Sequence, residues 1–236
     1  MLLGAGAAPL ESAEVQSLSN PVPNGAIVID GNLSDWAAVT PFQQDAVGDG
    51  SSGAARPLDI DILQGAIAHD ENFIYVLYRN AGDNMIDGAS NWIFFDLDRN
   101  PATGQNGIPG MNSIGMEFNL GGTGGWNAWN SVGGAFAGGA NGRTVATGDS
   151  SAIPAGADFL EYAISRTASQ PNGLTFNPIG GNSFNVVFGA EDTVLDTSPD
   201  NGSQNWFNYR VVPEPAAGTL GVTAAMALAC WRRRRS

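Results

Sequence analysis

The apolar positions of the chain fall into short runs separated by polar and glycine-rich segments. The strongest run, 92–97, leads directly into polar residues and a proline. Because side chains alternate between the two faces of an extended strand, Ile93, Phe95 and Leu97 share one face. The pattern predicts a strand that buries this face in a core and ends in a polar loop.

Eight further runs have the length and spacing of strands. They cover residues 26–29, 59–68, 73–78, 113–120, 143–148, 158–165, 183–190 and 205–212. In 113–120 every second residue from Ile114 to Leu120 is apolar, which indicates an antiparallel strand with one solvent-facing side. About nine short strands without an amphipathic helical stripe predict an all-β fold. We expect an antiparallel β-sandwich, jelly-roll or immunoglobulin-like, over residues 25–211.

Composition and charge narrow the class of protein. The 32 Gly and 13 Pro among 236 residues suit a fold with many turns. The formal net charge of −13 disfavours nucleic acid as a partner and favours cations or neutral ligands. A single cysteine, Cys230, excludes a disulfide framework within the chain. Segment 121–142 holds nine glycines, so we expect a long connection or two irregular hairpin loops there.

Both ends of the chain have the character of targeting segments. Residues 1–20 predict a signal-peptide remnant and leader, with Ala5-Gly6-Ala7 as a cleavage motif; the alternative is a frayed N-terminus without meaning. At the other end, an apolar segment, 216–231, separates two polar signals. These are the motif Pro213, Glu214, Pro215 and the cluster Arg232, Arg233, Arg234, Arg235. A C-terminal hydrophobic helix of about 24 Å with cytoplasmic arginines is therefore predicted.

Residues 212–236 resemble the PEP-CTERM sorting domain of Gram-negative envelope proteins. The resemblance implies export, transient anchoring in the inner membrane and cleavage near Glu214 by an exosortase-type enzyme. The mature protein would then reach the cell surface or the extracellular matrix. The alternative is a simple single-span anchor.

The body resembles family-9-type carbohydrate-binding modules and their DOMON-like relatives. The resemblance begins with Ile29-Asp30-Gly31-Asn32-Leu33-Ser34-Asp35-Trp36 and continues through segments in the same order, 67–76, 94–104, 160–164 and 196–202. It implies an antiparallel β-sandwich without catalytic machinery, often stabilised by a cation, that binds sugars. The glycine-rich segment 121–142 departs from the family pattern.

A candidate cation site follows the strongest strand. Asp96, Asp98, Asn100 and Thr103 offer hard oxygen ligands of the kind that Ca²⁺ prefers. The spacing is not that of an EF-hand, because Pro101 stands at the sixth position and Gly107 at the twelfth. The loop needs further ligands, from Glu117 or from Asp45 and Asp49. The alternative is an Asx-turn that simply ends the strand.

A candidate sugar platform lies in the glycine-rich segment. Trp126 and Trp129, interleaved with Asn127 and Asn130, place aromatic rings beside amide groups, the combination that sugar binding needs. The alternative is that both tryptophans are buried. Trp92, with Phe94 beside it on the same strand face, is a second candidate; its alternative is packing under a covering loop.

Catalytic functions find little support. His69 is the only histidine and falls in a predicted turn, so neither a serine–histidine relay nor a histidine-rich metal site is expected, and haem binding is remote. Glycoside hydrolysis by two carboxylates stays a remote alternative. We expect a non-enzymatic surface or matrix protein that binds polysaccharide, stabilised by Ca²⁺. The competing hypothesis is a structural or adhesion protein without a small ligand.

Overall fold

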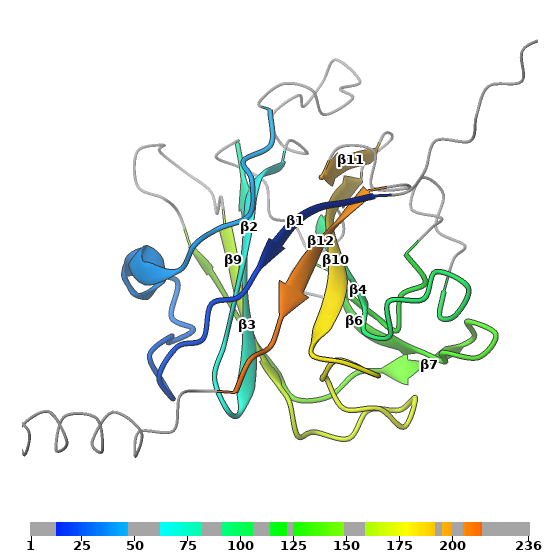
Figure 1. Ribbon diagram of the computed structural model, residues 1–236. Helices are drawn as coiled ribbons and strands as arrows, with labels where there is room; N and C mark the ends of the chain where they lie inside the picture. The colour runs from blue at the N-terminus through cyan, green and yellow to red at the C-terminus, as the bar shows by residue number, and fades with distance from the viewer. Residues whose placement is uncertain are drawn as a thin grey trace, which may run out of the picture.

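The protein is described by a computed structural model for residues 13–46, 62–81, 91–105, 114–121, 125–148, 159–191, 195–199 and 205–213. Two β-sheets lie face to face and enclose one hydrophobic core (Figure 1). The predicted β-sandwich is confirmed. The described part of the chain contains twelve strands and one short 3₁₀ helix.

The larger sheet has eight strands, in the order β1-β12-β10-β4-β5-β6-β7, with β11 beside β10. Its pairs are antiparallel except for the parallel pair of β1 and β12. The strands are β1 (Ala13–Leu18), β4 (Asn91–Asp96), β5 (Phe118–Gly121), β6 (Gly125–Trp129), β7 (Phe136–Gly139), β10 (Ser183–Glu191), β11 (Leu195–Ser198) and β12 (Asn205–Arg210).

The smaller sheet has four antiparallel strands in the order β2-β3-β9-β8. They are β2 (Ile62–His69), β3 (Phe73–Asn80), β8 (Arg143–Gly148) and β9 (Phe159–Ser165). The 3₁₀ helix η1 (Leu33–Ala38) lies on the side of this sheet that faces away from the larger one (Figure 1).

The core between the sheets is rich in aromatic side chains. Ile93, Phe95 and Leu97 point into it and are at most 1% exposed, as the alternation predicts. Phe95 contacts the rings of Phe176 and Phe184 at centroid distances of 4.9 and 5.9 Å. Burying one such side chain contributes about 1.5–3 kcal/mol, so this shared core holds the two sheets together.

Three sequence expectations are corrected by the fold. Residues 26–29 form no strand, because the Val28 amide donates to the Asp35 carboxylate (2.7 Å) instead of to a neighbouring strand. Segment 121–142 is more than loops, since its residues build β6 and β7. The sandwich also begins before residue 25: β1 lies within the segment assigned to the leader and pairs with β12.

The apolar alternation of 113–120 does not describe one strand. Phe118 and Leu120 point into the core between the sheets, whereas Ile114 and Met116 pack on the opposite, outer side of the larger sheet. The phase changes between Met116 and Phe118, where the chain bends before β5 begins. The polar positions are not solvent-facing either, because Glu117 is 0% and Asn119 3% exposed.

The C-terminal signals lie almost wholly outside the described residues, which end at Pro213. Glu214, Pro215, segment 216–231 and the four terminal arginines therefore stay sequence predictions. Within the part of the chain that the structure describes, no helix has the length and apolar character needed to cross a membrane.

Candidate functional site

The outer face of the larger sheet collects most of the predicted site residues. Alternation along β4 turns Trp92, Phe94 and Asp96 to this face, while Ile93 and Phe95 enter the core. The neighbouring strands place the remaining outward residues beside them. These are Asn119 on β5, Asn127 and Trp129 on β6, Asn185 and Val187 on β10, and Trp206 on β12.

An apolar cluster anchors three tryptophans on this face. Phe94 and Val187 from the strands, with Ile114 and Met116 from the segment that crosses them, form its buried centre. Trp92, Trp129 and Trp206 are partly buried against this centre and keep part of their rings exposed. We call Trp92, Trp129 and Trp206, together with Asn127, the tryptophan surface.

Trp126 is not part of a sugar platform. It is 5% exposed and stacks on Phe118 in the core, with a centroid distance of 5.3 Å and an interplanar angle of 14°. Trp126 and Trp129 are three positions apart on one strand, and an odd separation sends side chains to opposite faces. The predicted pairing of the two rings is therefore wrong, and only Trp129 reaches the outer face.

Trp129 is held in a defined position. Its indole N–H donates to Asn119 Oδ1 (3.3 Å), and its ring meets the edge of Phe136 at 5.3 Å. Phe136 itself is 58% exposed. Asn127 lies opposite Asn119 on the adjacent strand, so two amide side chains adjoin the ring. Asn130, also predicted, follows β6 and its backbone closes the turn to β7.

Trp92 lies over a glycine. A Cβ atom at Gly121 would come within 2.5 Å of the Trp92 ring, so only glycine at 121 lets the ring lie flat against β5. Phe94, its predicted companion, is 1% exposed beneath the crossing segment. Phe94 therefore packs under a covering segment, as the alternative for this pair stated, whereas Trp92 stays partly exposed.

Trp206 was not singled out from the sequence. It alternates with Asn208 on one face of β12, while Phe207 and Tyr209 enter the core. That alternation was the available signal. It shows that Trp206 and Phe207 lie on different faces, but the strand order of the larger sheet is needed to place Trp206 against the same apolar cluster as Trp92 and Trp129.

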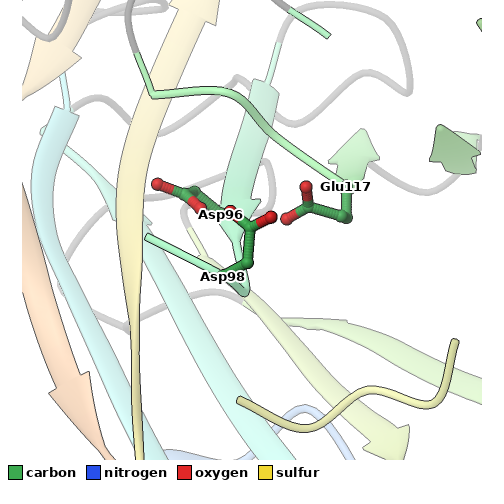
Figure 2. A group of neighbouring side chains, drawn as sticks. All are labelled: Asp96, Asp98 and Glu117. Carbon is green, nitrogen blue, oxygen red and sulfur yellow. The ribbon is translucent and has the colours of Figure 1, made fainter. Parts of the chain in front are cut away.

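Three carboxylates meet at the end of β4. Asp96, Asp98 and Glu117 each have a carboxylate oxygen within 4.8 Å of the others, and Figure 2 shows Glu117 facing the two aspartates. Glu117 immediately precedes β5, and its backbone amide donates to the Phe95 carbonyl (3.0 Å). Of the further ligands considered, Glu117 joins the group; Asp45 does not, and Asp49 lies outside the described residues.

The cluster is electrostatically costly without a cation. Burial, and after it the charge of Glu117, raises the pKa of Asp96 to about 8. A hydrogen bond from Asn185 acts in the opposite direction and lowers this pKa. Burial also raises the pKa of Glu117 to about 7, although the Leu97 amide donates to its Oε2 (2.8 Å). Glu117 Oε1 is buried without a hydrogen bond of normal geometry, although Ser131 lies near enough to lower the pKa slightly.

The loop after Asp96 contains the Asx-turn that the sequence offered as the alternative to a cation site. The Asp98 carboxylate accepts from the Asn100 amide (2.9 Å) and the Thr103 hydroxyl (2.9 Å), and Asn100 Oδ1 accepts from the Ala102 amide (3.1 Å). The two bonds from backbone amides are Asx-turn bonds. The side chain of Asn100 therefore serves the turn, whereas Asp96 and Asp98 converge with Glu117.

A hydrogen-bonded row connects this cluster to the sheet edge. Ser17 donates to Asn208 (3.2 Å), Asn208 donates to Asn185 (3.1 Å), and Asn185 donates to Asp96 Oδ2 (3.0 Å). Every bond in the row points toward the carboxylate. The four residues of the row lie on β1, β12, β10 and β4, which are neighbouring strands of the larger sheet, and together they fix the orientation of the Asp96 carboxylate.

The segment that contains Gly31 and Trp36 has a structural role here. Glu161 on β9 is 0% exposed and accepts from the Trp36 indole (2.6 Å) and the Gly31 amide (2.7 Å). Its carboxylate thus fastens the segment around η1 to the outer side of the smaller sheet.

His69 ends β2 and is buried instead of lying in an exposed turn. Its Nδ1 lies 2.7 Å from the Tyr209 hydroxyl, and its Nε2 lies 2.9 Å from the Val212 carbonyl. Both ring nitrogens are therefore engaged in holding the sheets and the end of the described chain together.

Comparisons with known proteins give structural likeness alone. No protein-family model matches the sequence, and no curated protein matches it. Two similar solved structures are family 9 carbohydrate-binding modules (CBM9) from Caldicellulosiruptor kristjanssonii, one in complex with glucose and one with cellotriose. They are 14% and 16% identical and cover 85% and 84% of this chain and 96% of theirs, with TM-scores of 0.46 and 0.45.

Proposed function

We propose that the protein binds polysaccharide, without catalysis, through the tryptophan surface of its larger sheet. The observation that carries this proposal is the arrangement of Trp92, Trp129 and Trp206 around one apolar cluster, each with part of its ring exposed. Partly exposed indoles on a rigid sheet offer flat apolar areas to the C–H faces of sugars. The neighbouring amide of Asn127, which is partly exposed, offers a donor and an acceptor for sugar hydroxyls, while the buried Asn119 holds the Trp129 indole in place.

Binding to a glycan array tests this proposal. Replacing Trp206 with Ala, or Trp92 with Ala, is expected to weaken binding by about 10- to 100-fold, because each removes one stacking surface from the ligand. Trp206→Phe, which keeps an aromatic face, is expected to retain part of the affinity. The measurement is titration of the purified full-length protein with the best glycan found on the array.

Phe73→Ala provides a matched control. Phe73 is also a partly buried aromatic residue, but it packs on the outer side of the smaller sheet. Its removal is expected to leave glycan affinity unchanged. An array without hits, or hits that survive both Trp206→Ala and Trp92→Ala, would overturn the proposal and favour a structural or adhesion role.

We also propose that Asp96, Asp98 and Glu117 bind Ca²⁺. Carboxylate oxygens are the ligands that Ca²⁺ prefers, and a divalent ion would offset two of the three negative charges of the group and engage Glu117 Oε1. The cation would stabilise the folded chain, since the converging geometry exists only there. At a Ca²⁺ concentration 100 times the Kd, the melting temperature is expected to rise by about 5 to 10 °C over that in EDTA.

We propose finally that the chain is exported and sorted by an exosortase-type enzyme to the cell surface or matrix. The order of Glu214, the apolar segment 216–231 and the terminal arginines supports this proposal. Replacing Glu214 with Ala in a host that has the processing enzyme is expected to leave an uncleaved, membrane-associated chain. Mass measurement of the extracellular and membrane fractions checks this; equal processing of both forms would contradict it.

A further inference from the structure

A pocket lies on the other side of the molecule from the tryptophan surface. It has a volume of about 180 Å³ and opens on the outer side of the smaller sheet, beside η1. Trp36 and Ala37 of η1 form one wall, and Ala66 and Leu77 from β2 and β3 form much of the floor. Most of the lining is thus apolar. The polar side chains that line it are Gln64 and Arg79.

Arg79 lines the pocket with part of its guanidinium buried. It alternates outward on β3, while Tyr78 enters the core. Its Nε is buried and has no hydrogen-bond partner among the residues that the structure describes. Arg166 shows the contrasting arrangement, since its Nε donates to Asn177 (2.9 Å) and its Nη1 to the Asp70 carbonyl (2.6 Å). A buried donor on a cation is costly when it is left unpaired, so Arg79 is poised for an acceptor.

We propose that this pocket binds a compact organic carboxylate. A guanidinium presents parallel N–H donors whose spacing matches the two oxygens of a carboxylate. The apolar walls would contact the carbon body of the ligand. Among the described residues that line the pocket, Arg79 is the only cation and balances one negative charge, so a monoanion fits better than a phosphate dianion in a protein of net charge −13.

Gln64 adds a second recognition element. It lies opposite Arg79 on β2, and its amide nitrogen donates to the Phe42 carbonyl (3.1 Å). This bond orients the side chain and leaves its oxygen as an acceptor for a ligand hydroxyl. A hydroxylated carboxylate such as a hexuronic acid matches both groups. The inference is independent of the proposed polysaccharide site, because the pocket and the tryptophan surface belong to different sheets.

Calorimetric titration of the full-length protein with D-glucuronate tests the inference, with D-glucose as the neutral counterpart and benzoate as a carboxylate without hydroxyls. We expect saturable binding of glucuronate, with a Kd of about 1 mM or lower, and weaker binding of benzoate. Arg79→Gln is expected to weaken glucuronate binding by about 10- to 100-fold. Arg79→Lys keeps the charge but loses the paired donors, so an intermediate loss is expected.

Two further variants make the test specific. Ala37 is exposed on η1 and lines the pocket, so Ala37→Phe would place a large side chain in the pocket while keeping Arg79, and it is expected to block binding. Arg210, exposed at the end of β12 in the larger sheet, is the matched control, and Arg210→Gln should bind as the wild type does. Glucuronate binding should also survive Trp206→Ala.

Several results would overturn the inference. These are failure of the wild type to bind either carboxylate, equal binding of glucose and glucuronate, or equal losses in Arg79→Gln and Arg210→Gln. Loss of glucuronate binding in Trp206→Ala alone would place the carboxylate on the tryptophan surface instead. If Arg79→Gln fails to fold, Arg79→Lys and Ala37→Phe still decide the question.

Discussion

Replacing Glu117 with Gln is expected to stabilise the cation-free protein at pH 8 and to reduce its stabilisation by Ca²⁺. The pKa values of Asp96 and Glu117 in the folded chain, about 8 and about 7, lie well above those of exposed carboxyls. The folded protein therefore holds these protons more tightly than the unfolded chain does. Their contribution to stability is complete below about pH 4 and is lost as the pH rises to about 8.

The expected gain in Glu117→Gln is on the order of 3 kcal/mol at pH 8 in EDTA, since a tenfold change in proton affinity is worth about 1.4 kcal/mol. Glutamine keeps an oxygen to accept from the Leu97 amide and removes the repulsion felt by Asp96. It also withdraws one charge from the proposed cation site, so Ca²⁺ would bind much more weakly.

Denaturant unfolding at pH 5 and pH 8, each in EDTA and in Ca²⁺, measures both effects. The wild type should lose stability between pH 5 and pH 8 in EDTA and regain it with Ca²⁺. The stability of Glu117→Gln should depend less on pH and less on Ca²⁺ than that of the wild type. The control is Glu14→Gln, because Glu14 is exposed on β1. A Ca²⁺ response that persists undiminished in Glu117→Gln, or a wild type that gains stability toward pH 8 in EDTA, would contradict the expectation.

Replacing Trp126 with Ala is expected to destabilise the protein by about 3–5 kcal/mol, the usual cost of removing a large aromatic residue from a core. Trp126 contacts Phe118, Phe95 and Phe176, so its loss opens a cavity at one end of the aromatic core. Trp129→Ala, three positions away on the same strand, should cost only about 1 kcal/mol of stability, because its ring is partly solvated.

Trp126→Phe sharpens this comparison. The Trp126 indole nitrogen is buried without a hydrogen-bond partner, so phenylalanine removes an unsatisfied donor while keeping an aromatic ring. The expected cost is below about 1.5 kcal/mol. Urea unfolding of the three variants measures the free energies, and glycan titration should show a loss for Trp129→Ala alone. Equal destabilisation by Trp126→Ala and Trp129→Ala would show that the two rings do not lie on opposite faces.

Trp126 and Trp129 show how much of the site could be predicted from the local sequence pattern. Their separation of three residues already implies opposite faces if β6 is a strand, but the nine glycines around them favoured loops over strands. Glycine weakens a strand when it is considered alone. In the protein, β6 and β7 form because β5 offers a neighbouring edge and the Trp126 ring fills the core. Tertiary pairing therefore overrode the local preference.

The sequence by itself determined the β-sandwich class, the core face of Ile93, Phe95 and Leu97, and the acidic loop after Asp96, because alternation and turn residues act over a few positions. Only the tertiary structure decided that Glu117 joins Asp96 and Asp98, that Trp206 joins Trp92 and Trp129, and that Arg79 lines a pocket under η1. These groupings depend on the order of the strands and on which face of each strand enters the core. Both are determined by packing between residues that are far apart in the sequence.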